Sequence, residues 1–454
     1  MTSLPKEKKL IGYLPNDRPP LIQMIILGFQ HVLTMFPATV LVALLVGFDV
    51  GTVLTVSGVA TITALILSRL VAGKFIPLYY GSSFSYIAAT LALTHAEFAT
   101  YAGDSVRLAQ VGIVATGLVN VTVGFIIRLV GKGSLDKILP PVITGSVATV
   151  IGISLAYSAL DMASAHWGVA LITLLATVLF SVYLQGKGFV GLLPILLGGI
   201  VGYFISIPFG LIDMAAVTTE AWLRVPRFTL PAFGDPRAWS AVGTIAVIAI
   251  ATIPESTAHL YQISLYVDQL ADRLGQKRYH LNELIGLNLI LDGIGDLING
   301  LFGGVAGTNY GENNSLMVIT RNYSGPALIA AGAIAILMGF VGKLAGLVNT
   351  IPVAVTGGLA IYLFGVIGMQ GVALMLAEKV NLYDPKQLAI GAAVLIVGIG
   401  GHIGYDGNLP IRILTGMFPD GLPAIATAAV LGIVLNLIFL VFKSPEVPDS
   451  SASS

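Results

Sequence analysis

Cysteine is absent from all 454 residues of the sequence. Its absence excludes disulfide bonds, thiolate metal sites and cysteine nucleophiles. Charged residues are also scarce, at 10% of the chain, and they balance to a formal net charge of zero. Because there is no long basic run either, the charge pattern gives no support for nucleic acid or another strongly anionic partner.

The sequence also lacks the short motifs of common enzyme chemistry. It has no glycine-rich phosphate-binding loop with a lysine, no HExxH zinc motif and no GxSxG nucleophile elbow. Residues 398–404 are rich in glycine, but they belong to the end of an apolar segment. We therefore expect no enzyme, no catalytic residue, no cofactor and no metal site.

What the sequence has in excess is apolar residues. They make up 56% of the chain, and the mean hydropathy is +0.90. These values are far from those of a soluble globular protein and predict a polytopic membrane protein surrounded by lipid. The first apolar run is long enough to span a bilayer, so we expect it to be an anchor and not a cleaved signal.

Apolar segments of about twenty residues predict an all-α fold with fourteen transmembrane segments. They lie near 21–46, 52–72, 76–95, 107–130, 141–160, 167–185, 190–213, 238–262, 281–302, 304–322, 325–347, 353–376, 386–402 and 420–442. If these segments alternate in direction, most lysines and arginines lie on the side of the N-terminus. The positive-inside rule then places both termini in the cytoplasm of a cell-membrane protein.

The two halves of the chain resemble each other. Residues 124–131, with Pro141 to Gly145 after them, recur as residues 339–346 followed by Pro352 to Gly357. Each half holds seven predicted segments, an odd number, so the second copy must enter the bilayer from the opposite side. Such a 7+7 inverted repeat is typical of secondary transporters.

Residues 303–321 interrupt the apolar sequence with glycines, a polar run and Glu312. Loose polar backbone survives at membrane depth only where it lines a cavity. We predict an extended run up to Tyr310, followed by a half-helix whose first-turn N–H groups can hold a carbonyl or an anion. The alternative is an ordinary re-entrant loop with a structural glutamate.

Residues 80–83 match residues 310–313 in this comparison of the halves. The match predicts two discontinuous helices, segments 3 and 10, each preceded by a short strand. In inverted-repeat transporters the substrate site lies where two such helices face each other near the midplane of the bilayer. We therefore expect the binding site between these two stretches.

We expect two domains, each assembled from both halves. A core domain would combine 21–133 with 238–347, and a gate domain would combine 134–213 with 348–442. Outside them lie a cytoplasmic tail, an extracytoplasmic loop and a disordered cytoplasmic tail, at 1–20, 214–237 and 443–454. The distribution of polar residues within segments supports this division, because the gate segments hold few of them. Those that we single out all fall in the core: Gln30, His31, Ser82, Ser83, Glu255, His259, Asp292, Asp296 and Glu312.

Glu255 and His259 are four residues apart, which puts both on one face of a helix. Pro254 is expected to kink that helix and to free a carbonyl group. Burial and a second carboxylate at Glu312 favour the protonated form of a carboxyl group, so proton coupling is expected, with His259 acting through water. The alternative is a Glu–His pair that only locks the helix against a neighbour.

Other polar residues allow more than one interpretation. His31, after Gln30, either supports the discontinuous helices by hydrogen bonding or is a satisfied core histidine. Asp292 and Asp296 share a helix face without a nearby cation in the sequence, so they are protonated, exposed to water or paired with backbone.

Two residue groups near the segment ends are expected to have no part in the site. Arg321 follows the predicted half-helix, where a cation suits the helix dipole, and is interpreted as structural. His402 and Asp406 are expected to be solvated near the far surface.

At these residues the chain resembles the nucleobase-ascorbate transporter (nucleobase:cation symporter 2) family, and within it the uracil branch. The resemblance covers nearly all of 18–442. It rests on Gln30-His31 with Met35-Phe36, Gly81-Ser82-Ser83-Phe84, Glu255 with His259, and Tyr310-Gly311-Glu312-Asn313 with Thr320-Arg321. It implies a fourteen-segment fold with core and gate domains, proton-coupled uptake of a nucleobase and a homodimer formed through the gate domain.

The resemblance also implies roles for individual residues. Glu255 and Glu312 would bind the N–H groups of the base, and His259 would act near Glu255. The full set of expected substrate-binding residues is Glu255, Glu312, Phe84, Tyr310, Gly311, Ser83 and Asn313. Gln30, His31 and Asn314 would support them from outside the site, while Glu255, His259 and Glu312 would carry the proton.

Several positions bear on the identity of the substrate. Glu312 and His259 are typical of the uracil branch, because purine carriers usually have glutamine and an acidic residue there. Asn314-Ser315 departs from that branch, which has an apolar residue followed by glycine. Our hypothesis is a proton-coupled uracil symporter with an elevator-type mechanism. The alternatives are a xanthine or uric acid permease, an anion carrier of the same fold, and a membrane ligand-binding protein without net transport.

Overall fold

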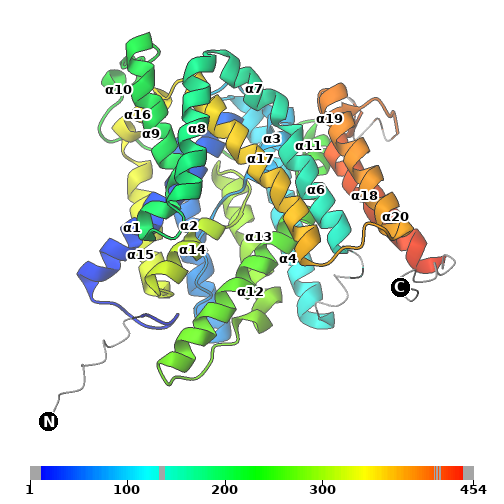
Figure 1. Ribbon diagram of the computed structural model, residues 1–454, viewed down its shortest axis with the longest axis horizontal. Coiled ribbons are helices and arrows are strands. Elements are labelled where there is room, and N and C mark those ends of the chain that lie inside the picture. The colour runs from blue at the N-terminus through cyan, green and yellow to red at the C-terminus, as the bar shows by residue number, and fades with distance from the viewer. Residues whose placement is uncertain are drawn as a thin grey trace.

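The computed structural model describes residues 12–442, except 132–136, 138, 414, 416, 417, 419 and 420. The described chain is mostly helical (Figure 1). Within it, nine helical stretches are long and apolar enough to cross a membrane, and four shorter helices are apolar as well. This is a multi-pass membrane protein. The predicted count of fourteen segments stays a prediction, and the predicted C-terminal tail lies outside the described residues.

Apart from α10, the helices of the first half lie at predicted segments. They are α1 Leu21–Val46, α2 Val50–Ala72, α3 Ile87–Thr94, α4 Asp104–Val130, α6 Pro141–Ser154, α7 Ala156–Ser164, α8 Trp167–Tyr183, α9 Pro194–Ser206 and α10 Ala215–Thr219. A 3-10 turn, η1, covers Phe84–Tyr86 before α3. Local sequence accounts for the ends of α2, since the Asp49 side chain accepts a hydrogen bond from the Thr52 N–H and Gly73 caps the other end in the left-handed conformation.

The second half of the chain is also mostly helical. Its helices are α11 Ala238–Ile245, α12 Ala249–Arg273, α13 Ile285–Phe302, α14 Gly311–Thr320, α15 Gly325–Gly339, α16 Gly342–Asn349, α17 Val353–Ala377, α18 Pro385–Leu395, α19 Gly401–Gly404 and α20 Ala424–Val441. Two predicted segments, 141–160 and 325–347, are each divided into two helices. A π-helical turn over Ile396–Gly400 interrupts the segment predicted at 386–402.

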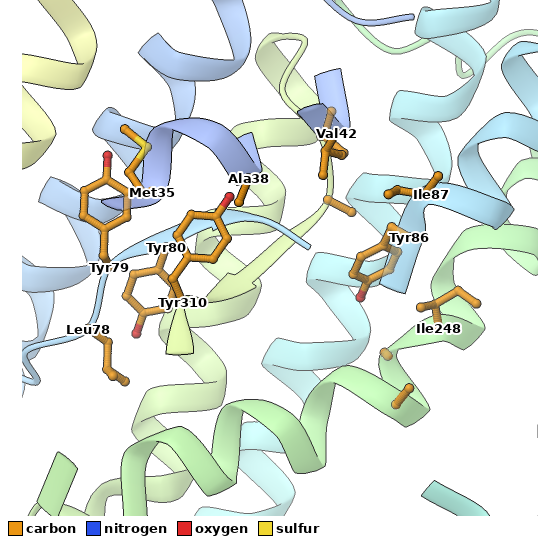
Figure 2. Packing of buried hydrophobic residues seen from close by; sticks show 14 of the residues in the cluster. Met35, Ala38, Val42, Leu78, Tyr79, Tyr80, Tyr86, Ile87, Ile248 and Tyr310 are labelled. Carbon is orange, nitrogen blue, oxygen red and sulfur yellow. The ribbon is translucent and has the colours of Figure 1, made fainter. Parts of the chain in front are cut away.

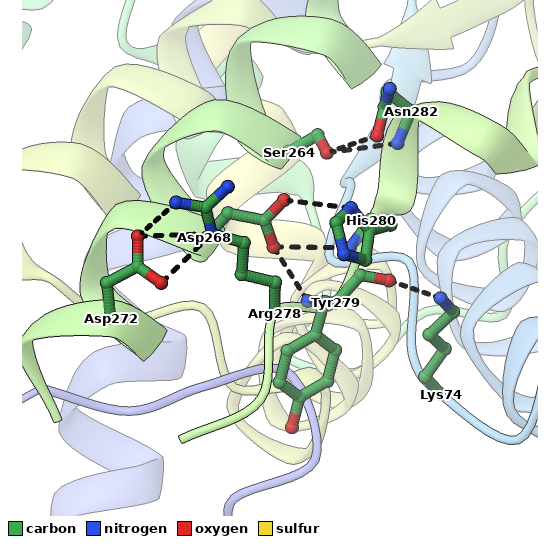
Figure 3. A network of polar contacts seen from close by, with 8 residues as sticks. All are labelled: Lys74, Ser264, Asp268, Asp272, Arg278, Tyr279, His280 and Asn282. Carbon is green, nitrogen blue, oxygen red and sulfur yellow. Dashed lines mark hydrogen bonds and ion pairs between the residues drawn. The ribbon is translucent and has the colours of Figure 1, made fainter. Parts of the chain in front are cut away.

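The helix α12 extends eleven residues beyond the predicted end at 262, to Arg273. Hydropathy does not detect this extension because its last turns carry charged residues. Figure 3 shows how a polar network fixes it to the chain that leads into α13. Asp268 accepts hydrogen bonds from the backbone N–H groups of Tyr279 and His280, at 2.7 and 3.2 Å, and Arg278 forms an ion pair with Asp272 at 2.8 Å.

Pairs of glycines bring the helices of the two halves into close contact. A Cβ atom added to Gly124 of α4 would lie 2.7 Å from the carbonyl oxygen of Gly286 in α13, and the reverse distance is the same. Gly145 of α6 and Gly371 of α17 approach each other in the same manner. Small residues at helix crossings are typical of membrane proteins, where close van der Waals contact holds the helices together.

These contacts divide the helices into two packing groups. In one, α1, α2, α4, α13 and α15 pack on one another, and in the other α6, α7, α8, α9, α17, α18 and α20 do so. In Figure 1 the helices of the second group lie around α17, and α18 and α20 lie at one end of the group. Each group contains helices from both halves of the chain.

Two short strands, one from each half of the chain, pair with each other. The strands β1 (Tyr80–Ser82) and β2 (Gly307–Asn309) form an antiparallel pair in which Tyr80 lies opposite Asn309 and Ser82 opposite Gly307. A second small pair joins β3 (Asn408–Leu409) to β4 (Leu422–Pro423).

The strand pairing corrects the predicted match between the halves. A two-fold axis through this pair relates Tyr80 to Gly307 and Ser83 to Tyr310. Ser83 and Tyr310 are also the N-cap residues of the helical turns that follow the strands. The prediction that residues 80–83 match residues 310–313 is therefore wrong by three residues. That prediction aligned the two Tyr-Gly pairs in the sequence. In the structure, the equivalent backbone positions are three residues away from that alignment.

Candidate functional site

A cavity of about 510 Å³ lies where the strand pair, α12 and the second packing group meet. This size is within the range of small-molecule sites. Its lining comes from the end of β1 and the residues after it (82–85), from α6 and α17, from residues 308–312 and Ser315, and from Pro254, Glu255, Ala258, His259 and Gln262 of α12. A larger cavity, of about 900 Å³, lies between α4, α11, α12 and α20, but its lining is almost entirely apolar and offers little to recognise a polar ligand.

The cavity brings together the acidic residues singled out in the sequence. Glu255 and Glu312 both line it, although they come from α12 and from the first turn of α14. Both side chains are partly exposed to it. No lysine or arginine is among the described residues that line this cavity. The arrangement therefore offers two carboxylate acceptors, and His259 is the only basic side chain among the described residues that line the cavity with them.

Backbone N–H groups face the same cavity from two helical turns. Tyr310 caps α14 without a side-chain hydrogen bond, and Asn314 is the first residue of that helix whose N–H bonds back, to the Tyr310 carbonyl. The N–H groups of Gly311, Glu312 and Asn313 precede it, so they are the unpaired donors of a helix N-terminus. Such donors suit the carbonyl oxygen of a ligand. Ser83 and Phe84 line the cavity at the start of η1.

Tyr310 is held in place by close packing around β1. Its hydroxyl group lies 2.8 Å from the Thr39 hydroxyl group, and its ring stacks on that of Tyr79 with centroids 6.3 Å apart. Figure 2 shows these rings among buried apolar side chains. A Cβ atom at Gly81 would lie 2.4 Å from the Tyr310 ring, so only glycine leaves room for it. The backbone that follows Tyr310 is therefore positioned by a rigid cluster.

Hydrogen bonding determines the tautomer of His259. Its Nδ1 atom lies 2.7 Å from Asn309 Oδ1 and 3.0 Å from the Asn309 carbonyl oxygen. Asn309 Nδ2 donates to Ser256 Oγ, which leaves Oδ1 as an acceptor. His259 therefore carries a proton on Nδ1 and, when neutral, presents Nε2 as an acceptor. A Cβ atom at Gly311 would lie 2.9 Å from Nε2, which places this nitrogen beside the start of α14.

Three of the expected residues lie behind the cavity. Asn313, expected to bind substrate, does not line it: its side chain is fully buried and its amide contacts His31, with Nδ2 3.1 Å from His31 Nδ1. Asn314 donates to the His259 carbonyl at 3.4 Å. Gln30 is also outside the lining, and its Oε1 atom is buried without a partner among the described residues. The contacts of Asn313 and Asn314 thus connect α14 to α1 and α12.

Asp292 and Asp296 of α13 form hydrogen bonds with the strand β2. Asp296, 1% exposed, accepts hydrogen bonds from the Gly307 N–H at 2.7 Å and from Asn120 at 3.1 Å. Asp292 accepts one from the Thr308 hydroxyl group at 3.3 Å, and its Oδ1 atom is buried without a partner in the described chain. Of the three interpretations, pairing with backbone therefore describes Asp296.

The residues placed outside the site lie as follows. Arg321 ends α14 in the left-handed conformation, and its carbonyl oxygen accepts the Tyr13 N–H. Asp406 is exposed, as expected, but His402 is half-buried and not fully solvated. In the described part of the chain, no group of three His, Cys, Asp or Glu side chains is placed to hold a metal ion.

Several polar residues of the lining were not predicted from the sequence, and two of them are glutamines. Gln262 lies on α12, and Gln370 lies on α17. Gln262 had a detectable signal, because residues 255, 259 and 262 follow the helical spacing of one face. Gln370 stands alone in an apolar segment, and only the packing of α17 against the cavity reveals it.

Comparisons with known proteins agree with one another. A model described as "Permease family" matches residues 22–406. The chain is 36% identical over 434 residues to the uracil permease of Bacillus caldolyticus, with 93% of each protein covered, and 34% identical over 435 residues to that of Escherichia coli K12, again with 93% of each covered. It is 31% identical to the uracil permease of Bacillus subtilis, with 98% of each covered.

Solved structures share the fold at low sequence identity. The transmembrane domain of the cyanobacterial bicarbonate transporter BicA aligns with a TM-score of 0.54 and 17% identity, covering 94% of this chain and all of that one. The structure of SLC26A9 aligns with a TM-score of 0.65 and 13% identity, covering 94% of this chain and 66% of that one. At these identities the likeness concerns the fold alone.

Proposed function

Because the chain belongs to the nucleobase-ascorbate transporter family, we propose that it carries a nucleobase across the membrane, with uracil as its principal substrate. The observation that carries this proposal is the cavity in which two carboxylates and the N-termini of two helical turns converge. The curated relatives that share most of its length are named uracil permeases, which supports uracil over other bases.

The groups in the cavity match the polar edges of uracil. The base has two N–H donors and two carbonyl acceptors. Glu255 and Glu312 accept hydrogen bonds from the N–H groups, and the backbone N–H groups at the starts of η1 and α14 donate to the carbonyl groups. Hydrogen bonds to charged groups contribute about 1.5–3 kcal/mol each, so the carboxylates supply most of the discrimination.

The same residues support proton coupling. Two carboxylates share a cavity without a lysine or arginine among its described lining residues, so uptake of a proton by one of them relieves their repulsion. His259 presents Nε2 beside the start of α14 and can pass a proton through water. The proton is then the coupling ion, and neither a cofactor nor a metal takes part.

The architecture of the proposal is a fourteen-segment, 7+7 inverted repeat with two discontinuous helices. The two packing groups support a core domain around 21–133 and 238–347, and a gate domain around 134–213 and 348–442. In this proposal the core moves past the gate in an elevator step, two copies associate through the gate domains, and both termini are cytoplasmic. Inhibition of transport by a cross-link between α12 and α17 would support the elevator step.

Counterflow in proteoliposomes tests the substrate. Vesicles loaded with unlabelled uracil are expected to accumulate radiolabelled uracil, and competition with thymine, xanthine and uric acid ranks the bases. Accumulation driven by xanthine but not by uracil would assign a purine carrier instead. Binding of a base without any accumulation in sealed vesicles would indicate a ligand-binding protein.

Glu255→Gln tests proton coupling. This variant keeps the volume of the side chain and one acceptor oxygen but cannot take up a proton. We expect uracil exchange to continue while an inward proton gradient no longer accelerates uptake, measured as initial rates with and without the gradient. If the gradient accelerates uptake equally in both proteins, the proton binds elsewhere.

An anion carrier is the second candidate, because a bicarbonate transporter shares the fold. The helix N-termini of the cavity are compatible with an anion, but Glu255 and Glu312 oppose one. Uptake of labelled bicarbonate or sulfate by the vesicles, without uracil uptake, would favour this candidate.

A further inference from the structure

The wall of the cavity formed by α17 differs from the other walls. Residues 363, 366, 367, 370 and 374 of this helix line the cavity, and their spacing places them on one face. Four of them are Leu363, Val366, Ile367 and Leu374, and the fifth is Gln370. An uncharged amide is thus the single hydrogen-bonding side chain that this face of α17 turns toward the site.

Gln262 brings a second amide to the same cavity from α12. It lies seven residues beyond Glu255, two turns further along the same helix face. The side chains of Gln262 and Gln370 are both exposed, and neither has a hydrogen bond to another described residue. A polar side chain in a membrane-spanning segment without a protein partner is a candidate for binding a ligand.

We propose that Gln262 and Gln370 form a second subsite that reads the edge of the base opposite its ring N–H and carbonyl groups. This inference rests on the proposed function. In uracil those four polar groups occupy four ring positions, and the remaining C5–C6 edge carries only C–H bonds. Since the carboxylates and helix N-termini take the polar groups, the C5–C6 edge is left to face the amides.

The chemistry of the subsite selects a class of ligand. A glutamine amide offers a carbonyl acceptor and two N–H donors, so it binds a group that donates, accepts or does both. Oxypurines meet this requirement, because xanthine is the uracil ring fused along C5–C6 to an imidazole with one donor and one acceptor nitrogen. The subsite therefore extends the substrate range from uracil to bases with a hydrogen-bonding group on that edge.

The experiment compares ligands that differ only along this edge. Purified full-length protein is titrated with radiolabelled uracil, and unlabelled uracil, thymine and xanthine compete for the site. Thymine adds a methyl group at C5 without a hydrogen-bonding atom, so it controls for size. Gln370→Met and Gln262→Met keep the length of the side chain but remove its amide. Met369→Leu, on the adjacent residue of α17 outside the cavity lining, is the matched control.

We expect xanthine to compete in the unmodified protein. Each Met variant is expected to weaken xanthine binding roughly 3- to 10-fold, as the loss of one neutral hydrogen bond predicts. The affinities for uracil and thymine should change by less than about 2-fold. The control variant should match the unmodified protein for all three bases.

Other outcomes would overturn the subsite. Equal weakening of uracil and xanthine would assign the glutamines a structural role, and an unchanged affinity for xanthine, or a protein that binds uracil but not xanthine, would remove them from recognition. These results leave the proposed uracil carrier intact. A protein that binds none of the three bases would instead contradict the proposed function itself.

Discussion

The two strand-and-helix stretches at the cavity share a backbone geometry but differ in chemistry. The first, β1 with η1 and α3, is anchored by neutral hydroxyl groups of α2: Ser57 donates to the Tyr80 carbonyl at 2.7 Å, and Thr61 bonds to the same residue at 3.0 and 3.1 Å. The second, β2 with α14, is anchored by carboxylates of α13, since Asp296 accepts the Gly307 N–H.

The helical turns after the strands show the same contrast. The first begins with Ser83 and Phe84, and the Ser83 hydroxyl group caps it by accepting from the Ser85 N–H at 3.3 Å. The second has no side-chain cap and places Glu312 in its first turn. The comparison teaches that two stretches can share a symmetric backbone frame while the charged side chains are concentrated in one of them. The following predictions test whether that asymmetry matters for stability and for binding.

The largest effect is a loss of stability, expected on replacing Asp296, the buried anchor of the second stretch. Asp296→Ala would leave the Gly307 N–H and the Asn120 amide without their partner. Each unsatisfied buried group costs about 1–3 kcal/mol, so a loss of about 2–6 kcal/mol is expected. Thermal unfolding of the purified protein in detergent measures it.

Thr61→Val is the matched variant in the first stretch. It also removes hydrogen bonds from a strand, but Ser57 still serves the Tyr80 carbonyl, so a smaller loss of about 1–3 kcal/mol is expected. If Asp296→Ala unfolds the protein during purification, Asp296→Asn, which retains an acceptor for Gly307, is the variant to measure. Equal losses for the two positions would contradict the contrast between the anchors.

A slightly smaller effect is expected on the affinity for uracil. Glu312→Gln removes the charge from the second stretch and makes its first turn resemble that of the first. The loss of one charge-assisted hydrogen bond predicts uracil binding weaker by roughly 10- to 150-fold. Equilibrium binding of labelled uracil measures this change.

Glu283→Gln is the control for this substitution. Glu283 is an exposed glutamate before α13, outside the cavity lining, and its replacement should leave uracil binding unchanged. Unchanged affinity in Glu312→Gln would exclude Glu312 from the site and would leave the charge difference between the stretches without a functional meaning.

The smallest effect is expected at the cap of the first stretch. Ser83→Ala removes the side-chain acceptor of a helical turn, which typically costs about 1 kcal/mol. We expect a lower unfolding temperature and a modest change in uracil affinity, because the backbone N–H groups remain. A loss of binding as large as that of Glu312→Gln would show that the Ser83 hydroxyl group itself contacts the base.

Several features were predictable because they depend on local sequence. The apolar segments, the start of a helix at Gly311 and the shared face of Glu255 and His259 all follow from hydropathy and helical spacing. The family was predictable from motifs spread over most of the chain, and the matching family model and the relatives confirm it.

Other features were not predictable from the letters. The register between the halves was assigned three residues off, because Tyr-Gly recurs in the sequence at positions that are not equivalent in the strand pair. Asn313 was expected at the substrate but is buried against His31, since the rotation of α14 about its axis turns it away from the cavity. Gln370 reaches the cavity only because α17 packs against it.

The sequence by itself determined that this chain belongs in a membrane and which family it joins, since solvation of apolar segments and the identity of local motifs are properties of neighbouring residues. The tertiary structure decided which polar groups meet in the cavity, which serve as anchors for the strands and which amides have no hydrogen-bond partner among the described residues. The reason is geometric. Residues more than two hundred positions apart come together only through helix packing, and a rotation of one helix by a single residue exchanges a side chain that lines the cavity for one buried behind it.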